Sequence, residues 1–158
     1  MDVEVRRAVA VDAPLLARLR WQWRGDERGE VGLVDRESFI DYFTTWTVDH
    51  LATHLPFLAE VQGRPVGMAW LVLSNRTPSP TLMDRRAGDV QSVYIAPELR
   101  GRGVGAKLMD ALLQHARDLE LVYLTVHSAA TATGFYAKLG FFDDNQWMAY
   151  RIDQRSPP

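Results

Sequence analysis

The stretch ELRGRGVGAKLMD, residues 98–110, constrains this chain more than any other segment. Gly101, Gly103 and Gly105 alternate with larger residues and lead directly into an amphipathic run. Glycine adopts left-handed backbone angles without a steric penalty, and the first N–H groups of a helix have no partner inside the helix. The segment therefore predicts a helix N-terminus whose amides bind a phosphate or diphosphate, with charge added by Arg100 and Arg102. A glycine-rich turn that binds nothing is the alternative.

Two known phosphate-binding patterns fit this segment less well. A P-loop needs Ser or Thr after its lysine, whereas Leu108 follows Lys107. The loose dinucleotide-binding pattern is satisfied by Gly101, Gly103 and Ala106. However, the residues PEL separate the preceding strand from the glycines, and the next predicted strand does not end in the Asp or Glu that would bind a ribose. A dinucleotide-binding module therefore stays as an alternative function.

The composition excludes several other classes of protein. The 158 residues carry a formal net charge of −2 and no cysteine, with a pI of about 6.1. This charge balance does not indicate a nucleic-acid or membrane partner, and the lack of Cys excludes disulfides, thiolate metal sites and a cysteine nucleophile. We predict no bound metal. No apolar run approaches the ~20 residues of a membrane helix, and the N-terminus lacks the layout of a signal peptide, so we expect a cytoplasmic protein.

Periodicity predicts the element order βααβββαβαββ in one α+β domain, residues 1–152, followed by a disordered tail, residues 153–158. Asp12 and Asp35 are predicted helix N-caps, and Gly140 a left-handed residue after a helix. The expected strands are residues 3–9, 55–61, 65–73, 89–96 and 121–126, with two short strands in 141–152; helices are expected after Asp12 and Asp35, at 103–118 and at 131–139; and 24–32 and 75–88 are expected to be loops.

Two segments together resemble the GNAT superfamily of acyl-CoA-dependent N-acyltransferases. VYIAPELRGRGVGAKLM resembles its central motif, a strand, a turn with Pro and the pattern Q/R-x-x-G-x-G/A, carried here by Arg100, Gly103 and Gly105. GFYAKLGF, residues 134–141, resembles its second signature, aromatic-Tyr-x-x-x-Gly-Phe. The resemblance covers residues 3–152. It implies a three-layer α/β/α fold with a mixed, mostly antiparallel sheet of six to seven strands, splayed between the fourth and fifth.

The resemblance also implies acetyl-CoA as co-substrate, bound in the gap between the splayed strands. An acceptor amine would attack the thioester directly, and a main-chain N–H of Val93 or Tyr94 would stabilise the oxyanion. Tyr136 would protonate the departing thiolate; the alternative is that Tyr136 is only a core aromatic residue. The residues implied to bind the coenzyme are Val93, Tyr94 and Ile95 for the pantetheine arm, Gly101, Arg102, Gly103, Val104, Gly105 and Ala106 with Arg100 for the diphosphate, and Ser128 and Ala129 near the arm.

One position departs from the family pattern. Many relatives carry Asn seven residues before the tyrosine, where it contacts the pantetheine arm, but Ala129 stands there in this chain. The side-chain hydrogen bond is therefore absent or comes from Ser128 or Thr131. A non-catalytic acyl-CoA-binding protein on the same fold is for this reason kept as the alternative to an enzyme.

The general base and the acceptor are less closely defined by the sequence. Glu60, Asp89 and His127 are the candidate bases near the expected gap, and a base acting through water or a neutral incoming amine is also open. Segment 24–50 holds seven acids against three arginines. With Trp21, Trp23 and Trp46 it predicts a site for a small basic amine rather than a large protein; the alternative is a solvated acidic face over core tryptophans. The sequence is compatible with a homodimer.

Overall fold

The computed structural model describes residues 1–28, 34–150 and 152. Its contacts divide the chain into two compact units, Met1–Val126 and His127–Pro158, which we describe separately. The predicted tail, residues 153–158, lies outside the described residues. No helix in the described ranges has both the length and the apolar character needed to cross a membrane.

The first unit is built on one sheet of five strands in the order β1-β2-β3-β4-β5. The first four strands pair antiparallel and β5 pairs parallel with β4. The strands are β1 (Glu4–Arg7), β2 (His54–Val61), β3 (Arg64–Arg76), β4 (Arg85–Ile95) and β5 (Leu124–Val126). The expected mixed, mostly antiparallel sheet is confirmed, but the expected count of six to seven strands is wrong, because no strand forms among the described residues after Val126.

The β2–β3 hairpin follows from its turn residues. Gln62 and Gly63 both have positive φ, 52° and 72°, as a two-residue turn that matches the twist of the sheet requires. Glycine adopts such an angle readily. The hairpin predicted at residues 62–64 is therefore confirmed, and it fixes the register of the two strands behind the site.

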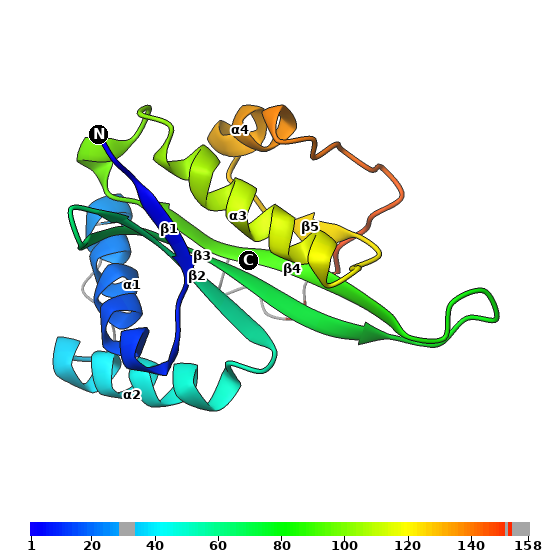
Figure 1. The fold of residues 1–158 in the computed structure, drawn as a ribbon, viewed down its shortest axis with the longest axis horizontal. Coiled ribbons are helices and arrows are strands. Elements are labelled where there is room, and N and C mark those ends of the chain that lie inside the picture. Colours follow the sequence, from blue (N-terminus) through cyan, green and yellow to red (C-terminus); the bar gives the residue numbers. More distant parts are fainter. Residues whose placement is uncertain (29–33, 151, 153–158) are drawn as a thin grey trace. The chain divides into compact units, whose positions relative to one another are not determined.

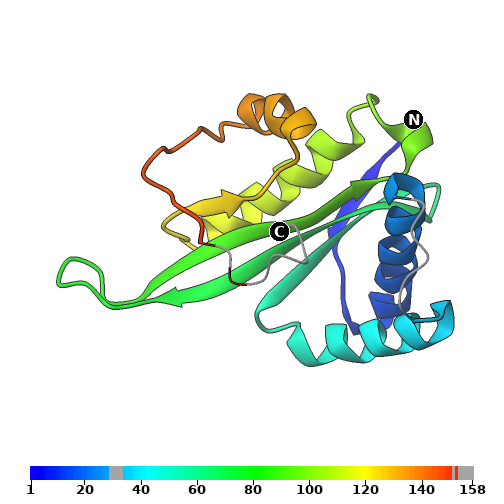
Figure 2. The same cartoon turned by 180° about the vertical axis from the view of Figure 1, so that it is seen from behind.

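The β3–β4 connection is more regular than the sequence predicted. Residues 75–88 were expected to form a loop, but Arg76 pairs with Arg85 and the two strands continue as a ribbon beyond the other strands (Figure 2). The two prolines lie between the paired segments, in residues 77–84. Proline excludes ladder pairing only where it stands, so the flanking residues remain free to pair.

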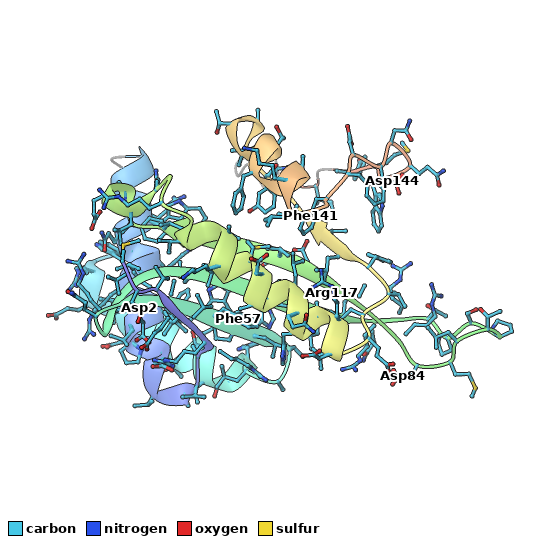
Figure 3. The ribbon with its side chains drawn as sticks, turned by 45° about the horizontal axis from the view of Figure 1, so that its top comes forward. Asp2, Phe57, Asp84, Arg117, Phe141 and Asp144 are labelled. Atoms are coloured by element: carbon cyan, nitrogen blue, oxygen red, sulfur yellow. The ribbon has the colours of Figure 1, made fainter. Side chains whose placement is uncertain are left out.

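Helices cover both faces of the sheet in the first unit (Figure 1). Helix α1 (Ala13–Arg28) packs against α2 (Arg36–His50) on one face, and α3 (Val104–Asp118) lies on the other. Successive side chains of β2 point to opposite faces of the sheet. Leu58 belongs to the core cluster with Leu16 and Leu19 of α1. The neighbouring Phe57 points the opposite way and contacts His115 of α3, at 5.7 Å between ring centroids (Figure 3).

The two predicted N-caps have different outcomes. Asp35 caps α2, accepting a hydrogen bond from the Ser38 amide at 2.9 Å. Asp12 instead ends the 3₁₀ turn η1 (Ala10–Asp12), accepts from the amide of Val9 and is ion-paired with Arg6. The N-cap prediction for Asp12 is therefore wrong, because its carboxylate binds groups that precede it in the chain.

The loop expected at residues 24–32 is also only partly present. Helix α1 continues through Arg28, so residues 24–28 are helical. Residues 29–32 of the expected loop lie outside the described residues. Polarity and three glycines, Gly25, Gly29 and Gly32, favoured a loop in this segment. Only Gly25 lies in α1, and a helix tolerates a single Gly at a cost of about 1 kcal/mol.

The second unit holds the 3₁₀ turn η3 (Ala130–Ala132) and helix α4 (Thr133–Lys138). Gly140, with φ of 95°, follows the helix as predicted. Its amide donates to the Ala137 carbonyl and the Phe141 amide to the Tyr136 carbonyl, both at 3.1 Å, which is a Schellman ending. Phe141 and Asp144 lie on the segment after α4 (Figure 3). The two strands expected in 141–152 do not form in its described part.

Candidate active site

The splay expected between strands 4 and 5 stays a prediction, because β5 ends at Val126 and over its whole length is paired with β4. Their pairs are Gly88 with Leu124, Asp89 with Thr125 and Val90 with Val126. β4 then continues to Ile95, and within the first unit no strand pairs with this edge of residues 91–95. We call the point after the last pair the fork. Main-chain groups left without a strand partner need another hydrogen-bonding partner, so this edge can bind an extended ligand that carries amides.

The register defines which main-chain groups face the open edge. The Ala96 amide donates to the Val66 carbonyl of β3 at 2.8 Å. Because successive residues of a strand direct their N–H and C=O groups to alternate sides, Ile95 and Val93 direct theirs to the open edge. The main-chain groups of Tyr94 face β3 by the same alternation. Val93, Tyr94 and Ile95 were expected to pair with a ligand arm. Of these, Val93 and Ile95 thus direct main-chain groups to the open edge.

A β-bulge interrupts β4 beside the fork. Trp70 pairs with Gln91 but Met68 pairs with Tyr94, so Ser92 and Val93 together oppose a single residue of β3. Ser92 has φ of 52°, an angle that non-glycine residues adopt mainly in bulges, turns and sites. This bulge was not predicted, although the adjacent polar residues Gln91 and Ser92 break the alternation of the strand.

The glycine turn joins β4 to α3 as predicted. Gly101 and Gly103 have φ of 72° and 82°, and Gly103 is the N-cap of α3. The first bond of the helix runs from the Lys107 amide to the Gly103 carbonyl at 3.1 Å. The amides of residues 104–106 therefore have no carbonyl from a preceding helical turn. Together with the helix dipole they form a site suited to an anion.

The two arginines of the turn differ in position. Nε of Arg100 donates to the Ile95 carbonyl at 2.9 Å, and its guanidinium lies 5.9 Å from the centroid of the Tyr94 ring. Arg100 thus ties the glycine turn to the end of β4, and it occupies one of the carbonyls on the open edge. Arg102 is exposed and adds positive charge to the turn.

Asp89 is the candidate base that the structure brings to the fork. Its Oδ1 accepts from Thr125 Oγ1 at 2.6 Å and its Oδ2 from Gln91 Nε2 at 2.8 Å. Asp89 pairs with Val72, and Gln91 with Trp70. Trp70 packs on Phe43 and Trp46 of α2, so these side chains lie on the face covered by α1 and α2. Asp89 was predicted from the sequence as a candidate base, but its two hydrogen-bond partners were not predicted.

Of the other two candidate bases, Glu60 lies away from the fork and His127 belongs to the second unit. Glu60 lies on β2, separated from β4 by β3, and its Oε2 accepts from Arg6 Nε at 2.9 Å. It is buried, and its charge is compensated by Arg6. His127 follows β5 directly, is exposed and belongs to the second unit.

The three tryptophans expected to line an acceptor site lie in the layer formed by α1 and α2. Trp23 stacks on Tyr94 at 6.2 Å and Trp21 contacts Phe39 at 5.5 Å between centroids. Trp46 packs against the core cluster and stacks on His50 at 4.3 Å. These contacts support the alternative interpretation in which the tryptophans are structural.

Tyr136 lies on α4 in the second unit. Its side chain is 8% exposed and contacts the rings of Phe135 and Phe141, at 5.1 and 5.5 Å between centroids. Burial raises the pKa of the Tyr136 phenol, so the hydroxyl keeps its proton at neutral pH. Ser128 is half-buried, and Ala129 precedes η3 as its N-cap residue.

Comparison with known proteins decides the family. The model of the acetyltransferase (GNAT) family matches residues 16–141. The chain belongs to this family. The match includes the fork, the glycine turn and α4, and the resemblance noted from the two motifs is confirmed.

Individual relatives share limited sequence identity with this GNAT chain. Glucosamine 6-phosphate N-acetyltransferase 1 of Oryza sativa is 36% identical over 63 residues, which are 40% of this chain and 38% of that protein. The amino-acid acetyltransferase of Mycobacterium tuberculosis is 28% identical over 137 residues, 87% of this chain and 67% of that protein. The chain thus spans well under half of the rice protein's length.

Solved structures show the same fold. A predicted acetyltransferase from Clostridium acetobutylicum, determined with acetyl-CoA, has a TM-score of 0.75 at 22% identity, over 96% of this chain and 97% of that one. A probable acetyltransferase has a TM-score of 0.79 at 22% identity, over 98% of this chain and 99% of the other. At this level of identity the likeness concerns the fold alone.

Proposed function

We propose that this GNAT chain is an enzyme that transfers the acetyl group of acetyl-CoA directly to the primary amine of a small acceptor. One observation carries the proposal: the open edge of β4 leads, through Pro97, into a helix N-terminus with free amides. An extended arm that carries amides and ends in a diphosphate matches this sequence of groups. Membership of the acetyltransferase family supports the same ligand.

Each part of the coenzyme has a proposed partner. The amides from Gly101 to Ala106 hold the diphosphate, and the positive φ of Gly101 and Gly103 supports this role. The main-chain groups of Val93 and Ile95 pair with the arm. Arg100 already donates to the Ile95 carbonyl, so the arm pairs with the Ile95 amide or displaces that contact.

Acetyl-CoA supplies a thioester carbon that a neutral amine can attack. The Val93 amide, which belongs to the bulge and faces the open edge, donates to the carbonyl oxygen as negative charge develops there. Asp89 receives the proton that the ammonium of the acceptor must lose before its nitrogen forms the new C–N bond. Asp89 lies four positions before Val93, on the order of 10 Å along a strand, so this proton passes through water.

Tyr136 completes the proton balance in the proposal. As the C–S bond breaks, its hydroxyl donates a proton to the thiolate, and the phenolate is reprotonated from solvent. The raised pKa of the buried phenol supports the role, because the group is fully protonated when the thiolate forms.

Two observations support a small acceptor. The tryptophans of the α1–α2 layer are engaged in packing, so recognition of the acceptor falls to polar groups such as Asp89. The relatives' names also include small amines, glucosamine 6-phosphate and amino acids. Transfer to a peptide or protein amine is the competing acceptor class.

A second candidate function is acyl-CoA binding without catalysis. Ala129 favours it, because this position lacks the amide side chain that the family pattern places near the arm. Both functions predict coenzyme binding, and only the enzyme predicts turnover.

The experiment that separates them measures thiol release from acetyl-CoA. The purified chain is assayed with pools of small primary amines, with amino-acid-like amines and with peptides, and binding of CoA is measured by calorimetry. The proposal predicts amine-dependent release with at least one small amine. Tight CoA binding without release in any pool would favour the binding protein, and release with peptides alone would contradict the small acceptor.

A further inference from the structure

Within the first unit, the carboxylate of Asp89 differs from the other half-buried or buried carboxylates that the structure describes. Asp12 and Glu60 both pair with Arg6. Asp89 is half-buried, and among the described side chains no Lys or Arg forms an ion pair with it. Its hydrogen-bond donors, Thr125 and Gln91, are neutral. Among the described side chains, then, two neutral donors hold the negative charge of Asp89 in place and no cation pairs with it.

The two donors restrict the carboxylate from both sides. Thr125 Oγ1 lies 2.6 Å from Asp89 Oδ1 and 3.5 Å from the Gly88 carbonyl, so its single proton points to Asp89. Gln91, two residues along β4, lies on the same face of the sheet and binds Oδ2 at 2.8 Å. A carboxylate offers about four lone-pair sites, and these two bonds leave the others available to a ligand.

Thr125 is well suited to this task. It lies directly opposite Asp89 in the parallel pairing, one pair before the fork. A β-branched side chain in a strand has restricted χ1 rotation, so its hydroxyl is fixed by the backbone. The carboxylate is thereby oriented close to the point where β5 ends and β4 continues.

We infer that Thr125 and Gln91 are positioning residues that fix Asp89 for the ammonium group of the acceptor. This inference rests on the proposed function, in which Asp89 is the proton acceptor. Each residue binds one oxygen, so the remaining lone pairs face the incoming amine or the water beside it. The proton moves from the ammonium nitrogen to Asp89, and the freed lone pair of the nitrogen forms the C–N bond.

The test is a double-mutant cycle with steady-state kinetics. The variants are Asp89→Asn, Thr125→Val, the pair combined, and Thr125→Ser, which keeps the hydroxyl. Each is assayed for thiol release with saturating acetyl-CoA, for CoA binding and for Tm. We expect Asp89→Asn to lower kcat about 100- to 10,000-fold. Thr125→Val should lower kcat about 10- to 100-fold, as for loss of a hydrogen bond to a charged group, with CoA binding unchanged.

The coupling distinguishes positioning from a structural role. If Thr125 acts through Asp89, Thr125→Val should have no further effect on kcat in the Asp89→Asn background. Thr125→Ser should keep kcat within about threefold of the parent, because it keeps the donor. Thr47→Val is the matched control. Thr47 is fully buried on α2 and its hydroxyl has no hydrogen-bond partner in the part of the chain that the structure describes, so this variant should keep the parent kcat.

The outcomes distinguish failure of the proposed role of Asp89 from failure of the positioning role of Thr125 and Gln91. If Asp89→Asn has the parent kcat, the role of Asp89 in the proposed function is wrong and the inference fails with it. If Asp89→Asn is impaired while Thr125→Val is not, or if the two losses multiply, only the positioning inference is overturned. If Thr125→Val fails to fold, Gln91→Met decides the question in the same cycle, with an expected loss of about 3- to 30-fold that vanishes in the Asp89→Asn background.

Discussion

Gly67 lies against the main chain of Tyr94, so that a Cβ at Gly67 would come within 2.9 Å of the Tyr94 carbonyl oxygen. The same Cβ would come within 2.5 Å of Ile95 Cδ1. A side-chain methyl can move aside, but the carbonyl is part of the β3–β4 ladder. The absence of a side chain at this position therefore allows β4 to approach β3 just before the glycine turn.

Gly67→Ala should lower the free energy of unfolding by about 1–3 kcal/mol, as overpacking does in a filled core. Because the displaced residues lead into the glycine turn, acetyl-CoA binding should weaken as well. Urea denaturation and calorimetry measure the two effects. Gly25→Ala is the control, since a Cβ there meets nothing within 4 Å and alanine is favoured in a helix. Parent stability in Gly67→Ala would contradict the close approach.

Gly103→Ala should weaken CoA binding about tenfold or more, because the left-handed N-cap of α3 orients the free amides. The angle costs an alanine about 1–2 kcal/mol, so the turn either relaxes or stays strained. Gly63→Ala is a matched control, with φ of 72° against 82° and open space around both positions. It should lose similar stability and keep its CoA affinity. Equal CoA affinity in Gly103→Ala and Gly63→Ala would show that the glycine turn does not bind CoA.

Asp12→Asn should destabilise the protein by about 1–3 kcal/mol near pH 7, the range for hydrogen bonds to charged groups. The Arg6 side chain is 42% exposed, which places the effect toward the lower end. Hydrogen bonding from Arg6 lowers the pKa of Asp12 in the folded protein, against an opposing effect of burial. This stabilisation is therefore present above the unfolded-state pKa of about 3.9 and is lost as the pH falls through the folded-state pKa.

Thermal unfolding of the parent and Asp12→Asn from pH 7 to pH 2 tests that sign. The difference in Tm should be largest near neutrality and should shrink below about pH 4. A difference that grows toward acid pH would show that the Asp12 pKa is not lowered by folding.

Tyr136→Phe should lower kcat roughly 10- to 1000-fold while CoA affinity stays within about twofold, because the ring packing against Phe135 and Phe141 is kept. Removal of this phenol should also remove a tyrosine that ionises above the usual range, since burial raises its pKa. Absorbance titration at alkaline pH checks the second point and steady-state kinetics the first. Parent turnover would exclude Tyr136 as the acid.

The sequence was most informative where one residue type determines a local conformation. Gly63, Gly103 and Gly140 marked a hairpin turn, a helix start and a helix end, and each has the positive φ expected of it. Asp35 marked the start of α2. These signals are local, because the backbone angle or the capping bond involves neighbours within a few residues.

Features that depend on distant pairing were not predictable in this way. The bulge at Ser92 and Val93 depends on the register of β3, and the bond between Thr125 and Asp89 joins residues 36 positions apart. Asp12 was misassigned because its partner Arg6 comes before the helix. The apolar pattern of residues 141–152 favoured strands, but a strand also needs a partner edge, which no pattern in the segment reveals.

The central claim is that main-chain amides of the glycine turn and of β4 hold the coenzyme. Amide chemical shifts of the isotope-labelled chain, followed during a titration with CoA, test this directly. The account predicts the largest changes at Gly101 to Ala106, with further changes at Val93 and Ile95. Saturable binding with changes confined to other residues, or no change at millimolar CoA, would contradict it.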